Sequence, residues 1–400
     1  MDTGNTDTGN TDTGNTDTSN MDTSSAASLK DRVCVMVEGI ADELLDVSHD
    51  LWDHPELAFE EHHAHDRLCT SLEAHGLDTT RSAYGLDTAF VASAGGSGPD
   101  VGVICEYDAL PGVGHACGHN IIAAAGLGAG IAAATVAEDA GGRVRVLGTP
   151  AEEGGGGKVF MAREGALEGL TAALMVHPAD HDLSEMECIA VQQLFVEYEG
   201  RASHAAAAPE QGINALDAAV LGYVGVAALR QHIGVNERIH GVFTDGGDKP
   251  NIVPSHAAMH WYVRSGNLES LERLGERVLA ALEAGALATG ATITHRWHDP
   301  AYADMVTDGA LLAMYRANIA RLGRDIDPPG AHAVVGSTDM GNVSHEVPSI
   351  HPMIAVAPPG VAIHTADFAT HARGEAGDRA VIDGAKALAC TVVDAWAAAH

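Results

Sequence analysis

The spacing of apolar residues changes along the chain, and these changes divide it into segments. Residues 28–49 carry apolar side chains three and four positions apart, which predicts an amphipathic helix, and a second such helix runs through Leu72. From there to about His177, short continuous apolar runs alternate with helical segments; the runs are residues 100–105, 143–147 and 172–176. This alternation predicts an α/β domain whose mixed, largely parallel sheet is flanked by helices.

Beyond residue 190 the apolar period shortens to two. Residues 191–198 alternate apolar and polar side chains, as in a half-exposed strand, and further strands are predicted at 257–264 and 291–297. Helices are predicted at 214–229 and 268–287. Residues 190–299 are therefore expected to form a small α+β domain, an antiparallel sheet with two helices, inserted into a larger domain of residues 28–189 and 300–400. The larger domain ends in a predicted helix at 378–399.

Two segments need a separate interpretation. Residues 1–27 repeat Thr-Asp-Thr-Gly-Asn with small variations and lack apolar periodicity, so we expect a disordered acidic tail, with a calcium-binding tract as the weaker alternative. Residues 121–137 carry no charge, but they are shorter than the ~20 residues of a membrane span. We expect a buried helix there, with Asn120 as its N-cap.

The chain carries a formal net charge of −33, from 55 acidic and 22 basic residues, of which only four are lysine. Such a charge repels nucleic acids and anionic membranes, and we expect neither as a partner. It also raises the hypothesis of a halophilic, high-salt cytoplasm, which stability measurements across a range of KCl concentrations would test. The six cysteines show no paired spacing, and no secretory signal is recognisable, so we expect thiols in a cytoplasmic, reducing location.

Several potential metal ligands follow the predicted strands. Because ligands gather at the carboxyl ends of strands in open α/β sheets, these residues could converge in one cleft as a hydrolytic metal centre. Each signal alone is weak, since most isolated Cys-x-His pairs and strand-end histidines are structural. The candidates in chain order are Cys117, His119, the pair Glu152-Glu153, His177 and His364.

The adjacent glutamates have a distinct chemical potential. In an extended chain Glu152 and Glu153 would project to opposite sides, so that one could bind a metal and the other could transfer protons. A solvated acidic pair is the alternative in so acidic a chain. The four glycines that follow, residues 154–157, favour a loop that wraps closely around an ion.

The order of these motifs resembles the M20 metallopeptidase and aminoacylase family, in particular the branch of amidohydrolases that includes p-aminobenzoyl-glutamate hydrolase and M20-domain dipeptidases of the β-alanyl-lysine type. The likeness runs from about residue 30 to the C-terminus. The motifs that carry it are His115-Ala-Cys117-Gly-His119, Thr149-Pro-Ala-Glu152-Glu153, Met175-Val-His177-Pro, Glu106-Tyr-Asp108-Ala-Leu-Pro, and the segments 200–209, 250–254 and 336–344.

The resemblance implies a catalytic domain interrupted by a lid that usually dimerises, so that the partners would be a second copy and a small amide or dipeptide substrate. It implies two divalent ions, best zinc or manganese with cobalt or nickel as further options. Their ligands would be Cys117, His119, Glu153, His177 and His364.

The resemblance also implies roles for residues around the metals. Glu152 would be the general acid/base, and His204 from the lid would hydrogen-bond the oxyanion that forms on the substrate. Asn251 would assist substrate binding, and Asp108 and His115 would orient the ligands.

One position departs from the commoner form of the motif. Asn120 stands where many relatives carry aspartate, which leaves the ligand basicity and the metal preference open.

The expected activity is hydrolysis of an amide bond in an N-acyl amino acid or a dipeptide-like molecule. Two alternatives stay open at the level of sequence: a hydrolytic deaminase that uses the same metal centre, and a catalytically silent binding relative that keeps the fold. Arg264 could grip a substrate carboxylate, although a surface salt bridge is the more common use of an arginine.

Overall fold

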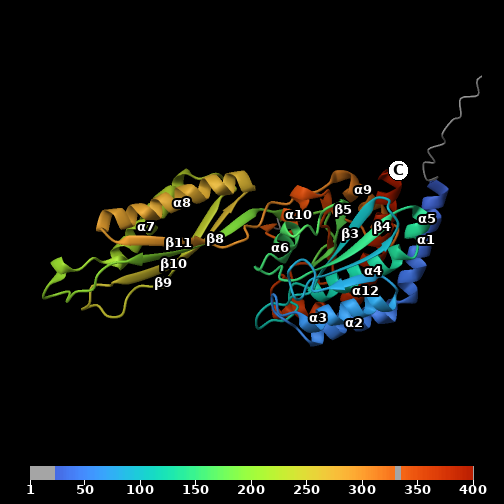
Figure 1. The fold of residues 1–400 in the computed structure, drawn as a ribbon, viewed down its shortest axis with the longest axis horizontal. Coiled ribbons are helices and arrows are strands. Elements are labelled where there is room, and N and C mark those ends of the chain that lie inside the picture. The colour runs from blue at the N-terminus through green and yellow to red at the C-terminus, as the bar shows by residue number, and fades with distance from the viewer. Residues whose placement is uncertain (1–22, 329–334, 400) are drawn as a thin grey trace, which may run out of the picture.

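The computed structural model describes residues 23–328 and 335–399, which form two units along the long axis of the molecule (Figure 1). The larger unit is built on a six-stranded sheet in which β3 pairs in parallel with β4 and β5, while β1 and β2 run antiparallel. The order across this sheet is β1 (Asp78–Arg81), β2 (Phe90–Gly95), β4 (Arg143–Thr149), β3 (Asp100–Glu106), β5 (Leu170–Leu174) and β13 (Ser349–Ile350). This mixed, largely parallel sheet confirms the predicted fold class.

Helices and two short parallel strand pairs complete the larger unit. The strand pairs are β6 (His177–Ala179) with β14 (Met353–Ala355) and β7 (Glu187–Cys188) with β12 (Val335–Gly336). The helices are α1 (Thr23–Gly39), α2 (Ala41–Asp53), α3 (His62–Ala74), α4 (His119–Ala134), α5 (Ala137–Ala140), α6 (Gly157–Arg163), α9 (Gly309–Ala320), α10 (Met340–Glu346), α11 (Ala366–His371) and α12 (Glu375–Ala399).

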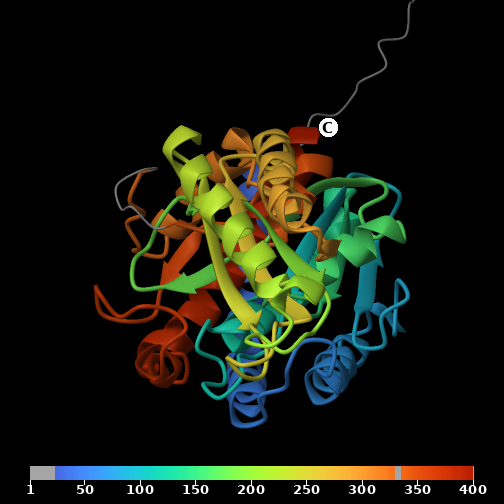
Figure 2. The ribbon, with the colours of Figure 1, turned by 90° about the vertical axis from the view of Figure 1, so that its left-hand side faces the viewer.

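The smaller unit is a four-stranded antiparallel sheet with two long helices on one face (Figure 2). The strand order is β11 (Thr292–Trp297), β8 (Ala190–Glu199), β10 (His256–Ser265) and β9 (Arg238–Asp245). The helices are α7 (Ala215–Leu229) and α8 (Leu268–Thr289), with short 3-10 turns at Pro209–Gln211 and Arg230–His232. Asn214 caps α7 by accepting from the Asp217 amide. The edge strand β9 has no counterpart among the sequence predictions.

The N-terminal predictions need two corrections. Residues 28–49 do not form one helix, because the chain breaks at Ile40 into α1 and α2. The predicted tail lies outside the described residues as far as residue 22, but Thr23 already begins α1, so that residues 23–27 are helical.

Helix α4 is buried along its length and packs between the sheet and α12. Its side chains are mostly alanine and glycine, which allow the helix to approach the strands closely. Asn120 is not its N-cap: Gly118 holds that position with φ of 78°. Asn120 instead belongs to the first turn of the helix, and its side-chain amide nitrogen donates to the Ser48 carbonyl, the Ser48 hydroxyl and the Ala372 carbonyl.

All six cysteines are free, and five of them are buried. Among the described helices none has the length and apolarity that crossing a membrane requires.

The packing of α4 against β4 gives a stability prediction. A methyl group on Gly130 would lie 2.1 Å from Val146 Cγ2, so Gly130→Ala should lower the free energy of unfolding by about 1–3 kcal/mol in urea titrations. Gly309→Ala is the matched control, since no atom lies within 4 Å of the added methyl at the start of α9. Equal stability of the two variants would contradict this account of the packing.

Candidate functional site

The candidate ligands meet where the central parallel strands end. Cys117 and His119 follow β3, the glutamate pair follows β4, and His177 opens β6 just after β5. The third apolar run, residues 172–176, is therefore not one strand that leads directly into His177, because β5 ends at Leu174 and His177 begins β6. The donor atoms form trios in which every pair lies within 4.8 Å: Cys117, His119 and His177; Cys117, Glu153 and His364; and His119, Glu152 and Glu153.

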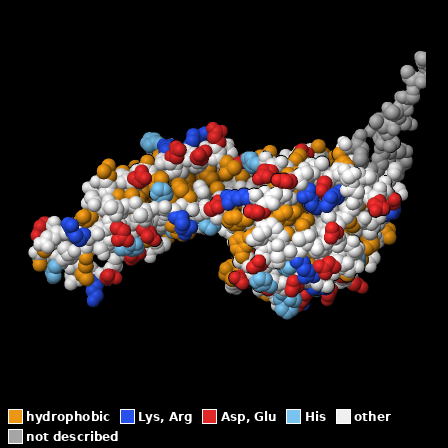
Figure 3. Space-filling model, in the orientation of Figure 1, with side chains coloured by type: hydrophobic (Ala, Val, Ile, Leu, Met, Phe, Trp, Pro, Cys, Tyr) orange, Lys and Arg blue, Asp and Glu red, His pale blue; other side chains and the backbone are white. Residues whose placement is uncertain are grey.

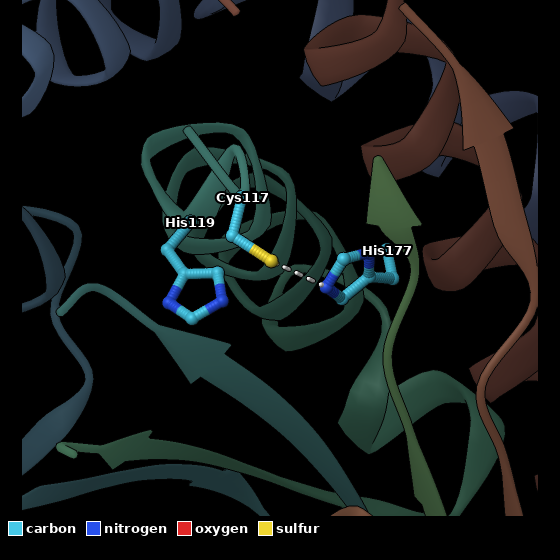
Figure 4. Close-up of side chains that lie close together, drawn as sticks. All are labelled: Cys117, His119 and His177. Atoms are coloured by element: carbon cyan, nitrogen blue, oxygen red, sulfur yellow. Dashed lines mark hydrogen bonds between the residues drawn. The ribbon is translucent and has the colours of Figure 1, made fainter. Parts of the chain in front are cut away.

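Cys117 and His177, which follow different strands of the sheet, make a close contact. The Cys117 Sγ lies 3.4 Å from His177 Nε2, and both side chains are buried (Figure 4). The other ring nitrogen of His177 is 2.7 Å from the Pro178 carbonyl, which fixes Nδ1 as the donor and leaves Nε2 as the free acceptor. Burial and the neighbouring His351 lower the pKa of His177 to about 3, so the ring is neutral.

Gly118 makes the turn that brings Cys117 and His119 together. Its backbone is left-handed, and a methyl group there would lie 2.8 Å from the Pro178 ring. Only glycine meets both conditions without strain.

Asp108 orients both His119 and the glutamate loop. Its Oδ1 lies 3.1 Å from His119 Nδ1, and its Oδ2 accepts the Glu153 backbone amide at 2.9 Å. Burial alone would raise the pKa of Asp108, but the His119 ring and the Glu153 amide outweigh it and hold the pKa below its usual value. His119 Nε2 is therefore directed at the cluster, where it lies 3.9 Å from both Glu152 and Glu153.

The glutamate pair sits on a tight turn, not on an extended segment. Ala151 has φ of 60°, and the two carboxylates approach the same nitrogen of His119, so the expected projection to opposite sides is wrong. The turn is held from outside: the Tyr302 hydroxyl donates to the Glu152 carbonyl at 2.6 Å and accepts the Gly154 amide at 3.1 Å. Backbone strain of this kind persists only where surrounding contacts impose it.

His364 closes the cluster from the loop before α11. Its Nε2 lies 3.2 Å from Glu153 Oε1, and its amide donates to the Ala116 carbonyl at 2.8 Å. The backbone of His364 is also strained, with φ of 65°. Its side chain is 49% exposed, so this side of the cluster faces solvent and can admit a substrate.

The cluster has the chemistry of a cation site. Among the described residues neither His119 Nε2 nor Glu153 Oε1 makes a hydrogen bond, although both atoms are buried; the approach of His364 to Glu153 is an ion-pair contact, not a hydrogen bond. Leaving such groups unpaired costs free energy, and a divalent cation at the cluster would satisfy both. One thiol, three imidazoles and a carboxylate form a donor set that suits zinc and related ions.

Glu152 has the properties of a proton carrier. Burial first, and then the charges of Glu106 and Glu153, raise the pKa of Glu152 well above its usual value. A carboxyl group whose pKa is raised by its surroundings holds a proton more readily, so it can both accept and donate one during turnover.

The structure does not bring His204 and Asn251 to the cluster of their own chain. Both lie in the loops at the far end of the small sheet, since β8 starts near the larger unit and runs ten residues before these loops (Figure 1). A strand of that length spans about 30 Å. His204 Nδ1 accepts the amides of Ala206 and Ala207 at 3.2 Å, which places the ring proton on Nε2.

His115 is buried beside the cluster without touching it. Burial and the charge of His119 lower the pKa of His115 to about 3. Within residues 23–328 and 335–399 no hydrogen bond links its ring to a candidate ligand, and its Nδ1 has no partner. Its carbonyl accepts the Gly118 amide at 3.1 Å, so it supports the ligand turn through the backbone.

A buried charge triad was not predicted from the sequence. Lys158 Nζ lies 2.6 Å from both Glu106 and Asp339, and all three side chains are fully enclosed. The other oxygen of Glu106 is 3.7 Å from His119 Nε2, so the triad adjoins the cluster. Glu106 and Asp339 stand in motifs that the resemblance identifies, whereas Lys158 had no signal beyond its place after the glycine run.

Glu61 is the second support that sequence reasoning missed. This buried carboxylate accepts the amide of Ala151 at 2.9 Å and the hydroxyl of Thr88 at 2.8 Å. Burial raises its pKa to about 7. It had no sequence signal, because Glu60-Glu61 has the pattern of a solvated pair.

A pocket of about 280 Å³ opens beside Glu153 and His364 and reaches the small sheet. Arg264 lines it, half-buried, and donates to the Ser337 hydroxyl at 3.2 Å. In the part of the chain that the structure describes, the contacts of Arg264 are the Ser337 hydroxyl and the face of the Tyr262 ring, so the salt bridge favoured from sequence is not formed. Burial lowers the pKa of its guanidinium.

Comparison with known proteins agrees with this geometry. The model of peptidase family M20/M25/M40 matches residues 99–393. The Xaa-Arg dipeptidase of Mus musculus is 39% identical over 382 residues, which cover 92% of this chain and 88% of the relative. One of the subunits of the p-aminobenzoyl-glutamate hydrolase of Escherichia coli (strain K12) is 35% identical over 303 residues, 70% of this chain and 63% of the relative.

A solved structure shares the fold. It is a Bacillus subtilis protein described as a dinuclear metal-binding peptidase of the M20 family, with a TM-score of 0.69 at 21% identity, covering 89% of this chain and 98% of the other. The family match and the identity to full-length relatives together show that the chain is a metallo-hydrolase and belongs to peptidase family M20/M25/M40.

Proposed function

We propose that this chain hydrolyses the amide bond of a dipeptide or an N-acyl amino acid with two divalent cations as cofactors. Cys117, His119, Glu153, His177 and His364 would hold the cations. The observation that carries the proposal is the convergence of these five donors from separate segments of the chain into two trios, both of which contain Cys117. Zinc and manganese suit the donor set best, and cobalt or nickel would also fit.

The bound cations would polarise the scissile carbonyl and lower the pKa of the attacking water. Glu152 would take the proton from that water and later deliver it to the departing nitrogen, as its raised pKa allows. Tyr302 and Glu61 would serve this step indirectly, since they hold the backbone on either side of Glu152.

His204 would stabilise the oxyanion of a second copy's substrate. Its Nε2 carries the ring proton and is free to donate, and the Asn251 carbonyl accepts the amide of Ala205 next to it at 3.0 Å. Because both residues lie about 30 Å along the small sheet from their own cluster, a partner subunit is the simplest recipient of these groups. We accordingly propose that residues 190–299 act as a lid and dimerisation domain.

The small unit offers a surface on which a second copy could dock. Helix α7 exposes Val220, Leu221 and Val224, the last at 57%. Strand β9 is an open sheet edge that exposes Val242 and Phe243. An apolar helix face beside an unpaired strand edge favours association through continued strand pairing.

Arg264 would bind a carboxylate of the substrate. It lines the pocket beside Glu153, and among the described residues its guanidinium contacts the Ser337 hydroxyl and the Tyr262 ring rather than a carboxylate. The relatives' names describe a dipeptidase and a hydrolase of a glutamate amide, and both kinds of molecule carry such a carboxylate.

The proposed reaction predicts a specific defect in Glu152→Gln. A metal-supplemented screen of dipeptides and N-acyl amino acids should detect a freed amine together with a new carboxylic acid. On the best substrate, Glu152→Gln should keep its metal content and lose roughly 10²–10⁴-fold in kcat, because the proton carrier is removed. Glu164→Gln, on an exposed side chain, is the control and should match the wild type.

Other outcomes of this screen select the alternatives. Near-normal turnover by Glu152→Gln would remove its assigned role. Ammonia released without a new carboxylic acid would indicate a deaminase. Metal binding with no turnover of any compound would indicate a silent relative.

Subunit mixing tests whether His204 acts in the partner's site. His204→Ala alone should lose roughly 10²–10³-fold in kcat, as expected for an oxyanion donor. Reassociating His204→Ala chains with Glu152→Gln chains should restore about a quarter of wild-type activity, since half of the dimers then contain one intact composite site. Mixing Glu153→Gln with Glu152→Gln chains is the control and should restore none. No recovery in the first mixture would show that His204 does not act across subunits.

If Arg264 binds a carboxylate of the substrate, its replacement should reduce activity only on substrates that carry that carboxylate. Arg264→Met should lower kcat/KM by about 10- to 100-fold, mainly through KM, because a charge-assisted hydrogen bond is removed. A substrate with an amidated carboxyl group should be cleaved equally by the wild type and the variant. Arg296→Met, which removes a guanidinium stacked on Phe195, is the matched control. An equal loss on the amidated substrate would assign Arg264 a structural role through Ser337.

A further inference from the structure

A second group of metal-ligating side chains lies apart from the cluster, where α2 ends and α3 begins. Asp50 and His54 stand one turn apart at the end of α2, and His63 lies in the first turn of α3. His63 Nε2 is 2.9 Å from Asp50 Oδ2, and His54 Nδ1 is 3.1 Å from Asp50 Oδ1. Their donor atoms all lie within 4.8 Å of one another. Histidines gather on this surface over α3 (Figure 3).

We propose that Asp50, His54 and His63 form a peripheral binding site for a zinc-class divalent cation. In tetrahedral zinc sites with bonds of about 2.0–2.1 Å, neighbouring donor atoms lie about 3.3 Å apart. The distances from His63 Nε2 to Asp50 Oδ2 and from His54 Nδ1 to Asp50 Oδ1 are a few tenths of an ångström shorter than that spacing. A small outward shift of the two rings would therefore admit the ion. The two imidazole rings already lie close together, with centroids 4.7 Å apart.

The charges around this site favour a cation on balance. Arg67 opposes one, with Nε 3.6 Å from Asp50 Oδ2, but its Nη2 is drawn off to Asp46 at 2.7 Å. The exposed acids Asp53 and Glu60 lie nearby in sequence, and the chain as a whole carries −33. Binding must also displace the His54 proton that now points to the Asp50 backbone oxygen at 2.9 Å.

A cation bound by His54 and His63 would hold both ends of the connection between α2 and α3, which includes the loop of residues 54–61. The Glu56 carboxylate of this loop accepts the amides of His63 and Ala64, and the Glu56 carbonyl accepts the Ala109 amide at 2.8 Å, next to Asp108. The loop ends at Glu61, which holds Ala151 ahead of Glu152. The site would therefore brace a segment that supports the glutamate turn, while contributing no ligand to the cluster itself.

Cobalt(II) titration separates the two sites, because only a centre that contains Cys117 gives a thiolate charge-transfer band. In the wild type, cobalt uptake measured by equilibrium dialysis should continue after that band has saturated. The double variant His54→Ala/His63→Ala should bind about one ion fewer per chain with the same thiolate band. His62→Ala, an adjacent exposed histidine outside the trio, is the control and should keep the wild-type count. Asp50→Asn provides a second variant, and thermal unfolding verifies that each variant is folded.

Equal cobalt counts in the wild type and the double variant would overturn the proposal, and would show that hydrogen bonds to Asp50 alone explain the arrangement. Loss of the ion in His62→Ala would overturn it as well, by pointing to non-specific surface uptake. Absence of the thiolate band would instead count against the ligand assignment of the active centre. The two proposals therefore fail by different signals.

Discussion

Asp108 is the side chain on which the geometry of the site depends. One of its oxygens faces His119 Nδ1 and the other accepts the Glu153 amide, so a single buried carboxylate links the loop after β3 to the loop after β4. This link decides which nitrogen of His119 is directed at the cluster, and it brings Glu153 within reach of the same point. A cation that binds there finds its donors already oriented and loses less conformational entropy than it would among mobile side chains.

Charge balance is the second constraint. Glu106, Asp108 and Glu152 are enclosed together, and Lys158, which Glu106 shares with Asp339, is the one buried lysine or arginine close to them among the described residues. Burial first, and then the remaining negative charge, raises the pKa of Glu152, and that negative charge also makes the cluster attractive to divalent ions. In the proposed reaction the same excess of acid would support both metal binding and proton transfer. The positive charge of Lys158 lowers the free-energy cost of burying these carboxylates. Without a compensating charge, a buried carboxylate would take up a proton instead.

The sequence predicts what depends on local pattern, and misses what depends on distant partners. Convergence of Cys117 and His177 was predictable because parallel strands deliver their following residues to one edge of the sheet. The turn at Ala151 was not, because its positive φ is imposed by Glu61 and Tyr302, which lie 90 residues before and 151 residues after it. Asn120 has the chemistry of a helix cap, but its amide is engaged by Ser48 and Ala372, and the backbone of Gly118 takes the cap position.

The length of β8 links the architecture to the oligomeric state. A ten-residue strand carries the loops that hold His204 and Asn251 about 30 Å from the cluster of their own chain, and β10 runs back alongside it with an unbroken pairing, so the sheet is stiff along this direction. Folding these loops back onto their own cluster would require the small unit to swing about the connections near Ala190 and Trp297. For these loops to reach the cluster of a neighbouring chain, the two chains need only to pack together through the exposed apolar residues of α7 and β9. The second route leaves the sheet intact and buries surface that is otherwise exposed, which is why we favour a composite site built from two chains.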